Sequence, residues 1–225
     1  MSELIDTTEM YLKSIIELEE EGLLAMRARI GERLGQSGPT VSQTVSRMER
    51  DGLVILSDDK TLMLTEFGRE RAISVMRKHR LAERLLVDVI GLDWHDAHDE
   101  ACRWEHVMSE EVERKIAGLV STVDSSPYGL AIPGLREIGL QAEEVVLGKP
   151  ASELPDGEYT LTQIGEPLQV DKELLQQLQE LSLLPGAKII LEDQGTHKFI
   201  ISQPKDEGLI IEFDISRHIF LSPRV

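Results

Sequence analysis

The chain has 225 residues, 41% hydrophobic and 29% charged, with a formal net charge of −17 at pH 7. These values are typical of a globular protein with more than one domain. There is no apolar run of about 18 residues and no basic start followed by an apolar segment, so neither a membrane span nor a secretion signal is expected. The single cysteine, Cys102, excludes an intramolecular disulfide and agrees with a reducing, cytoplasmic location.

The negative charge alone argues against nucleic acid, but it is unevenly distributed. Residues 141–225 carry 15 acidic and 7 basic residues, whereas residues 1–74 carry 14 and 9. A local basic face can exist inside an acidic protein, although long-range repulsion weakens its hold on DNA. We therefore expect a separate mechanism that activates DNA binding. The basic residues of the N-terminal third include Arg27, Arg29, Arg33, Arg47, Arg50 and Lys60.

Three helices are predicted in this N-terminal third. The first begins at the capping residue Asp6 and ends at Gly22. The second covers about residues 27–34, and the third runs from Pro39, favoured at a first helical position, to Gly52. Two short helices joined by a tight turn are typical of a helix-turn-helix.

A β-hairpin wing is predicted next, with strands at 53–56 and 61–64 around the polar tip 57–60. The alternative is a helical bundle with a hairpin and no DNA-binding role. The outward positions of the third helix favour DNA, because hydroxyl, amide and guanidinium groups suit base edges and phosphates. Thr40 and Gln43 are the candidates for base contact, and Arg47 and Arg50 for phosphate contact. The full set predicted to contact DNA is Arg27, Ser37, Pro39, Thr40, Ser42, Gln43, Arg47, Arg50 and Lys60.

From about residue 66 to 116 the pattern is helical and carries groups that can bind a metal. At about 100° per residue, such groups gather on one face of each of two helices. A lone helical histidine is usually structural, which is the interpretation given to His95, His197 and His218. Convergence on two faces favours a metal site instead. The converging groups are His79 and Glu83 on one helix and His98, Cys102, Glu105 and His106 on the next.

Imidazole with carboxylate suits Fe(II), Mn(II), Co(II), Ni(II) or Zn(II), and a sulfur ligand disfavours Mg(II), Ca(II) and, less strongly, Mn(II). The spacing does not match a structural zinc site. Met10, in the first turn of the first helix, is either a core residue or a further sulfur ligand, and periodicity leaves both open.

Gly and Pro residues at 125–134 indicate turns. From about residue 148 the sequence pattern changes from helical to β-rich. Short β-rich runs occur at 159–164, 187–191, 198–202, 209–213 and 218–221, with a helical insert at 174–184. This spacing predicts a small β-barrel.

Several segments resemble the diphtheria toxin repressor group of iron-dependent regulators. The resemblance is strong over roughly residues 1–140. The later residues resemble the family only in their β-rich pattern and their place in the chain. It rests on DTTEMYL at 6–12, RARIGERL at 27–34, QSGPTVSQTVSRMERDGL at 36–53, VMRKHRLAERLL at 75–86 and HDEACRWEHVMSEEVER at 98–114.

The resemblance implies a mostly α-helical N-terminal two-thirds followed by a small all-β SH3-like barrel. It implies a winged helix-turn-helix domain at 1–73, a helical metal-binding and dimerisation domain at 74–140, a linker at 141–150 and the SH3-like domain at 151–225. The expected function is a metal-dependent repressor, Fe(II)-activated, that binds double-stranded operator DNA as one homodimer or two and controls iron-homeostasis genes. It needs no membrane partner and is not an enzyme.

The resemblance also divides the ligands into two sites for Fe(II), which Co(II), Ni(II), Mn(II) or Zn(II) would replace in vitro. The family's barrel adds a carboxylate and an amide to the ancillary site; Asp171 or Glu173 is expected here, with no Gln at the matching spacing. Cys102 can bind through its sulfur or its backbone carbonyl. The primary site would use Met10, Cys102, Glu105 and His106, and the ancillary site His79, Glu83 and His98.

Three alternatives remain. A Mn(II)-responsive regulator would have the same architecture. A di-iron metalloenzyme would need carboxylates from four helices, and no second Glu-x-x-His pair is present. A redox regulator would use Cys102 as its sensing thiol, but Glu100 and Glu105 beside it in sequence are not expected to lower its pKa.

Overall fold

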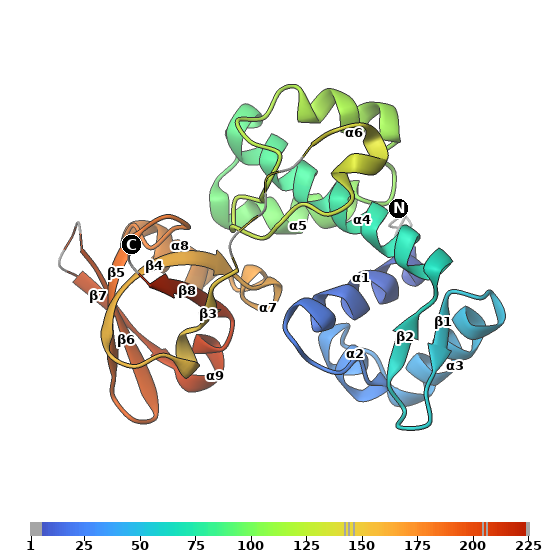
Figure 1. The fold of residues 1–225 in the computed structure, drawn as a ribbon, viewed down its shortest axis with the longest axis horizontal. Coiled ribbons are helices and arrows are strands. Elements are labelled where there is room, and N and C mark those ends of the chain that lie inside the picture. Colours follow the sequence, from blue (N-terminus) through green and yellow to red (C-terminus); the bar gives the residue numbers. More distant parts are fainter. Residues whose placement is uncertain are drawn as a thin grey trace.

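The computed structural model describes residues 6–141, 143, 145, 147–203, 205 and 207–223. These residues form an N-terminal helical part with a hairpin, a second helical part and a C-terminal part built on one sheet (Figure 1). The predicted fold class, helical over the first two-thirds and β-rich in the last third, is confirmed.

The N-terminal part has the predicted winged helix-turn-helix order. Asp6 caps the first helix, because its Oδ1 accepts hydrogen bonds from the backbone N–H groups of Thr8 (2.8 Å) and Glu9 (3.2 Å). The wing strands are antiparallel, with Ile55 opposite Met63. The elements are α1 (Thr7–Glu20), α2 (Arg27–Arg33), α3 (Gly38–Arg50), β1 (Val54–Leu56) and β2 (Leu62–Leu64).

Helix α4 (Glu66–Leu85) belongs to two cores at once (Figure 1). Its first half places Ala72 and Met76 in the N-terminal core, and its second half places Leu81 and Ala82 in the core of the helical domain. The predicted domain boundary at 73/74 therefore falls inside one continuous helix. A rigid helix shared by two domains couples their relative position.

The helical domain continues with η1 (Leu86–Ile90), η2 (Trp94–Asp96), α5 (Ala97–Trp104), α6 (Glu110–Ala117) and η3 (Leu135–Ile138). Helix α5 ends earlier than the ligand spacing predicted. The N–H of Glu105 still donates to Ala101 O at 3.0 Å, but the chain then turns toward Ser109, whose Oγ accepts from Val112 N at the start of α6. Glu105 and His106 thus lie in the turn after α5, not on the helix.

The C-terminal part is a curved antiparallel sheet of six strands in the order β3-β8-β4-β5-β6-β7 (Figure 1). The predicted strands and insert lie within a few residues of those observed, but β3 falls inside the predicted linker and the short α7 was not predicted. The strands are β3 (Lys149–Pro150), β4 (Gly157–Ile164), β5 (Lys188–Asp193), β6 (His197–Ser202), β7 (Glu207–Glu212) and β8 (Ile219–Pro223). The helices are η4 (Ala151–Glu153), α7 (Glu166–Gln169), α8 (Lys172–Glu180) and α9 (Phe213–Ser216).

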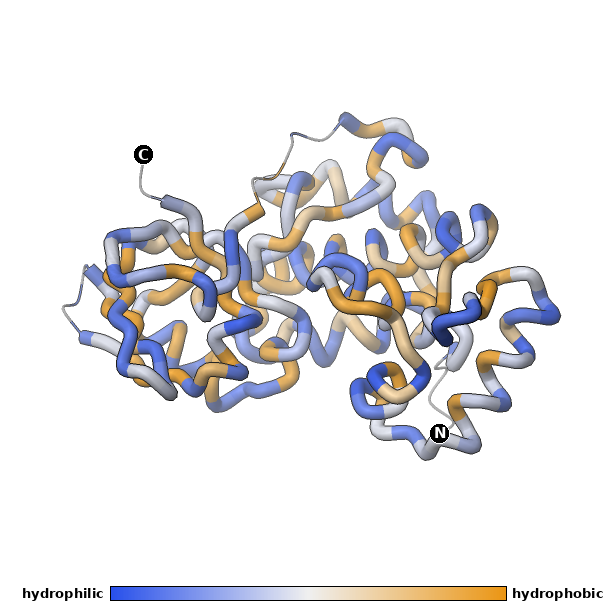
Figure 2. Tube along the Cα trace, turned by 60° about the horizontal axis from the view of Figure 1, so that its bottom comes forward, coloured by the Kyte–Doolittle hydropathy of each residue, from blue (hydrophilic) through white to orange (hydrophobic). Residues whose placement is uncertain are grey.

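Each part has its own hydrophobic core, and hydrophobic residues recur along its helices and strands rather than in one long block (Figure 2). In the described part of the chain, no helix combines the length and apolar character that crossing a membrane requires. Helix α7 lies where the sheet domain approaches the helices, and α1 lies on the other side of the same region (Figure 1).

Candidate metal centre and DNA-binding face

The outer side of α3 presents the predicted DNA-contacting groups. Val41, Val45 and Met48 are buried on its inner side. The opposite side is polar, since Ser42 is half-buried and the remaining groups are exposed: Thr40, Gln43, Ser46, Arg47 and Arg50. This face can carry out both base reading and phosphate contact.

The other predicted contacts lie around that face. Ser37 and Pro39 are exposed at the start of α3, and the Ser37 hydroxyl lies 2.9 Å from Thr40 Oγ1. Lys60 is exposed at the wing tip, with a positive φ of 67°. Arg27, like Ser42, is half-buried, and its Nε has no hydrogen-bond partner.

Helices α4 and α5 bring His79, Glu83 and His98 together in the interior. His79 Nε2 lies 2.7 Å from Glu83 Oε1 and 3.2 Å from His98 Nδ1. His98 Nδ1 is also 3.2 Å from Glu83 Oε1, so three potential ligand atoms surround one point. Burial lowers the pKa of His98, but the hydrogen bonds that its ring donates to Cys102 and Glu83 outweigh burial and raise that pKa to about 9.

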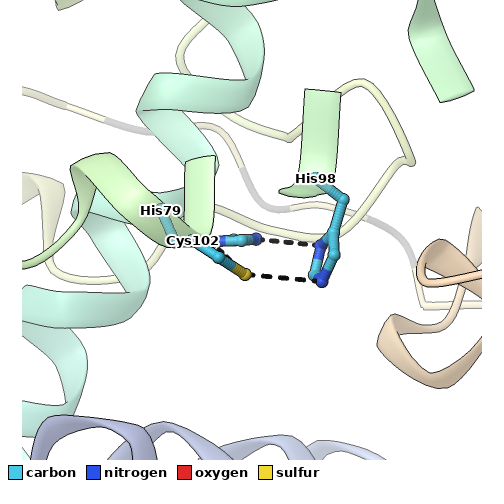
Figure 3. A group of neighbouring side chains, drawn as sticks. All are labelled: His79, His98 and Cys102. Atoms are coloured by element: carbon cyan, nitrogen blue, oxygen red, sulfur yellow. Dashed lines mark hydrogen bonds between the residues drawn. The ribbon is translucent and has the colours of Figure 1, made fainter. Parts of the chain in front are cut away.

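Cys102 faces the same two histidines (Figure 3). Its Sγ is 3.6 Å from His98 Nε2 and 4.0 Å from His79 Nδ1. Burial opposes its ionisation, but the charges of Lys13 and His79 outweigh burial and lower the pKa of the thiol to about 5. As expected, the sequence neighbours Glu100 and Glu105 do not lower this pKa; the groups that lower it are neighbours in space and not in sequence. A thiolate is the form in which cysteine binds metal.

Glu105 and His106 extend the cluster toward α1. Glu105 Oε2 lies 2.6 Å from His79 Nδ1, and Glu105 Oε1 lies 3.4 Å from His106 Nε2. His106 Nδ1 lies 2.7 Å from Glu9 Oε2, which ties this end of the cluster to the first turn of α1. Burial raises the pKa of Glu105, but the charges of Lys13 and His79 outweigh it and lower that pKa to about 2.

Met10 and Lys13, one helical turn apart on α1, line a cavity of about 510 Å³ together with His98 and Cys102. Met10 therefore shares a cavity with two members of the cluster. Sequence reasoning overlooked Lys13. It is 3% exposed, and its Nζ lies 3.1 Å from Glu105 Oε2 and 3.7 Å from Cys102 Sγ.

The C-terminal domain reaches the cluster through α7. Glu166 Oε2 lies 3.8 Å from His79 Nε2 and 3.6 Å from His98 Nδ1. Gln169, on the same helix, is 1% exposed; its Nε2 donates to Ile164 O, while its Oε1 has no hydrogen-bond partner. A carboxylate and an amide three residues apart thus face inward, where the sequence prediction expected no Gln.

Asp171 and Glu173, predicted for this role, do not reach the cluster. Asp171 Oδ1 accepts from Leu174 N and caps α8, and Glu173 is exposed. The error arose because residues 168–174 were compared with the expected segment, whereas the segment that packs against the histidines begins earlier, directly after β4.

The donor set suits a transition metal. Of the ten buried side-chain atoms without a hydrogen-bond partner in the described part of the chain, four belong to this cluster, and a fifth, on Gln169, lies on the same short helix as Glu166. An unpaired buried acceptor is costly unless a cation or water binds it, and carboxylate, imidazole and thiolate groups bind divalent transition metals. These five atoms are Glu83 Oε2, Glu105 Oε1, His106 Nε2, Glu166 Oε2 and Gln169 Oε1.

The remaining histidines lie outside this cluster. His197 is exposed beside Thr196, and burial lowers the pKa of His218. His95 lies with Asp93 and Asp96 in a solvent-accessible group, in which Lys172 Nζ already pairs with Asp96 at 2.7 Å. Because this group is accessible to solvent and Asp96 is already paired with Lys172, His95 is interpreted as a structural residue and not as a metal ligand.

The helical domain also exposes apolar side chains. Val89 and Ile90 are 48% and 56% exposed, whereas Leu86 is buried and Leu85 and Trp104 pack partly against the core. Among these residues, Val89 and Ile90 are therefore available to a partner.

Comparisons with known proteins agree with this arrangement. Residues 3–62 match the family model described as "Iron dependent repressor, N-terminal DNA binding domain". Residues 65–134 match the model described as "Iron dependent repressor, metal binding and dimerisation domain".

Among curated relatives, the chain is 58% identical over 200 residues to the diphtheria toxin repressor of Corynebacterium glutamicum, covering 87% of this chain and 88% of that one. It is 49% identical over 226 residues to the iron-dependent repressor IdeR of Mycobacterium tuberculosis, covering 97% and 98%. The crystal structure of T. acidophilum IdeR superposes with a TM-score of 0.78 at 26% identity, covering 97% and 99%.

A manganese-dependent transcriptional repressor in complex with manganese superposes with a TM-score of 0.82 at 22% identity, covering 97% of this chain and all of that one, which shows a shared fold. Together with the paired DNA-binding and dimerisation domains, the identity over nearly the whole length settles the family. The chain belongs to the iron-dependent repressors, the metal-dependent transcriptional regulators that include the diphtheria toxin repressor.

Proposed function

We propose that this protein is an Fe(II)-activated repressor that binds operator DNA as a dimer and controls genes of iron homeostasis. The observation that carries the proposal is the origin of the ligand groups. Met10 comes from α1 of the DNA-binding domain, where Glu9 also contacts His106, whereas His79, Cys102 and their neighbours come from α4, α5 and the turn after α5.

A metal bound between these elements favours one relative position of α1 and the helical domain. Because α1 packs in the same core as the helix-turn-helix, that position also fixes α3. A ligand that binds one conformation more tightly shifts the population toward it. The proposed mechanism is therefore an equilibrium between two poses of the DNA-binding domain, biased by the metal.

Two sites per chain are proposed, on opposite sides of His79. The primary site would use Met10, Cys102, Glu105 and His106, with Cys102 binding through its sulfur because the pKa of its thiol is low. The ancillary site would use His79, Glu83 and His98 together with Glu166, and Gln169 as the amide. Since Glu166 comes from the C-terminal domain, an ion there would link that domain to the helices.

Iron is favoured by the donor set. A thiolate and a thioether suit Fe(II), Co(II) and Ni(II) better than Mn(II). Close relatives over the full length are named as iron-dependent repressors, whereas the manganese regulators share the fold at lower identity. Co(II) and Ni(II) are expected to bind at least as well as Fe(II) in vitro, by the Irving–Williams order, so availability would select iron in the cell.

A mobility-shift assay on the protein's own promoter regions tests the proposal. DNA should shift with Fe(II) under anaerobic conditions and with Co(II) or Ni(II), and should not shift in chelator. Binding that responds to peroxide and not to metal would favour the redox alternative, and a response confined to Mn(II) would favour the manganese regulator. Sedimentation of the complex gives one dimer or two per operator.

A further inference from the structure

A buried lysine from the DNA-binding domain lies at the centre of the candidate metal ligands. Lys13 Nζ is 3.0 Å from His79 Nδ1, 3.1 Å from Glu105 Oε2 and 3.7 Å from Cys102 Sγ. Both Lys13 and Glu105 are buried, so water does not screen this pair. A buried ammonium in hydrogen-bond contact with a carboxylate and a thiolate compensates negative charges that a metal ion would otherwise compensate.

The two cations share the same partners. Glu105 and Cys102 belong to the proposed primary site, and each can either accept a hydrogen bond from the Lys13 ammonium or bind a metal ion. His79 Nδ1 cannot accept from Lys13 and donate to Glu105, 2.6 Å away, in the same tautomer. A divalent ion and an ammonium within about 3–4 Å of each other repel strongly in a buried site.

We propose that Lys13 is an internal competitor of the metal, whose side chain must leave Glu105 and Cys102 before the primary site is filled. The inference rests on the proposed two-site function and adds to it a residue that sets the metal concentration at which the protein responds. In this position Lys13 also holds α1 to the helical domain through an ion pair, which metal binding exchanges for ligand bonds.

The structure contains a cavity into which the displaced Lys13 side chain can move. The cavity of about 510 Å³ is lined by Lys13 together with Glu17 from the same helix and Glu21 directly after it. Glu17 Oε1 already lies 3.9 Å from Lys13 Nζ, and Glu17 Oε2 lies 3.2 Å from the Arg33 guanidinium of α2. A Lys13 side chain that turned into the cavity would approach Glu17. Because Glu17 pairs with Arg33 of α2, this movement would alter a contact of the helix-turn-helix.

The test compares full-length wild type with Lys13→Gln, Lys13→Arg and the control Lys115→Gln, which removes one exposed lysine of α6. Co(II) is titrated, and the thiolate-to-cobalt absorption band reports filling of the site that contains Cys102. We expect Lys13→Gln to bind Co(II) at least tenfold more tightly than wild type, and Lys13→Arg and Lys115→Gln to gain less than threefold. In chelator, Lys13→Gln should melt at a lower temperature than wild type, and Co(II) should remove that deficit.

Equal Co(II) affinities for wild type and Lys13→Gln, with metal-dependent DNA binding intact, would overturn the inference and leave the proposed function standing. Weaker binding by Lys13→Gln would also overturn it, since it would make the lysine a supporting group. If wild type itself binds no Co(II), the proposed function fails and the inference with it. If Lys13→Gln does not fold in chelator, refolding it in Co(II) and withdrawing the metal by competition gives the same affinity.

Discussion

Glu166 Oε2 lies 3.6 Å from His98 Nδ1, although the two residues belong to different domains. The contact places a carboxylate of the C-terminal domain at a buried histidine pair of the helical domain. Because opposite charges attract strongly where water is excluded, this contact docks the C-terminal domain when His98 is protonated. A metal at the same point would exchange the ion pair for ligand bonds from both domains.

Replacing Glu166 by Gln should weaken the ancillary site. Loss of one anionic ligand is expected to reduce Co(II) affinity at the ancillary site by roughly tenfold or more, with the primary site nearly unchanged. Isothermal titration calorimetry measures both. Glu173→Gln is the matched control, since Glu173 is an exposed glutamate of α8. If Glu173→Gln weakens binding and Glu166→Gln does not, α7 is not part of the site.

Arg50→Ala should lower DNA affinity across operator sequences. Arg50 is exposed at the end of α3, where a guanidinium can contact a phosphate. Each such contact contributes a slope of about 0.9 in log affinity against log salt concentration. Fluorescence anisotropy at several salt concentrations should give a slope shallower by about one unit, with Lys115→Ala as the control. A slope equal to that of wild type would remove Arg50 from the phosphate contacts.

Metal affinity should rise with pH because His98 must lose a proton to bind metal. The hydrogen bonds that its ring donates to Cys102 and Glu83 outweigh burial and raise the pKa of His98 to about 9, so the ring is protonated on both nitrogens at neutral pH. Metal and proton compete for its nitrogens, and each proton released makes affinity rise on the order of tenfold per pH unit below that pKa. Cys102, with a pKa of about 5, is already a thiolate and releases none.

Calorimetry in buffers of different ionisation enthalpy counts the protons that Co(II) displaces between about pH 6.5 and 8.5. His197→Gln, at an exposed histidine, should displace the same number as wild type. An affinity that stays constant over this range would mean that the histidine pair is neutral before metal binds.

Metal preference should follow the sulfur ligands. Replacing Met10 by Asp and Cys102 by Glu would leave only nitrogen and oxygen donors, which Mn(II) accepts more readily than sulfur. In anaerobic titrations of DNA binding, the Mn(II)-to-Fe(II) affinity ratio should rise by about tenfold, or 1.4 kcal/mol. A folded double variant with an unchanged ratio would show that sulfur does not set selectivity.

The sequence was sufficient for local features. The cap at Asp6, the helix-start residue Pro39 and the stops at Gly22 and Gly52 predicted the first and third helices, because such signals depend on neighbouring residues alone. Helical spacing likewise predicted that His79 and Glu83 share a face.

Residues whose role depends on contacts with residues far away in the sequence were not predicted. Lys13 stands between Leu12 and Ser14 as an ordinary helical lysine, and only contacts with residues such as Glu105, far along the chain, show that it is buried in the cluster. Glu166 was missed because its four-residue helix follows β4 directly and has no periodicity of its own. A useful signal would have been its spacing of three from Gln169, which places both on one helical face.

The central claim is that metal binding and DNA binding share one conformational equilibrium. It is tested most directly by measuring operator affinity with and without saturating Co(II), and Co(II) affinity with and without saturating operator. Thermodynamic reciprocity requires the two ratios to be equal. We predict a common factor well above tenfold in wild type and a factor near one in His106→Gln, which loses a primary ligand. A wild-type protein that binds Co(II) tightly while its operator affinity does not change would contradict the account.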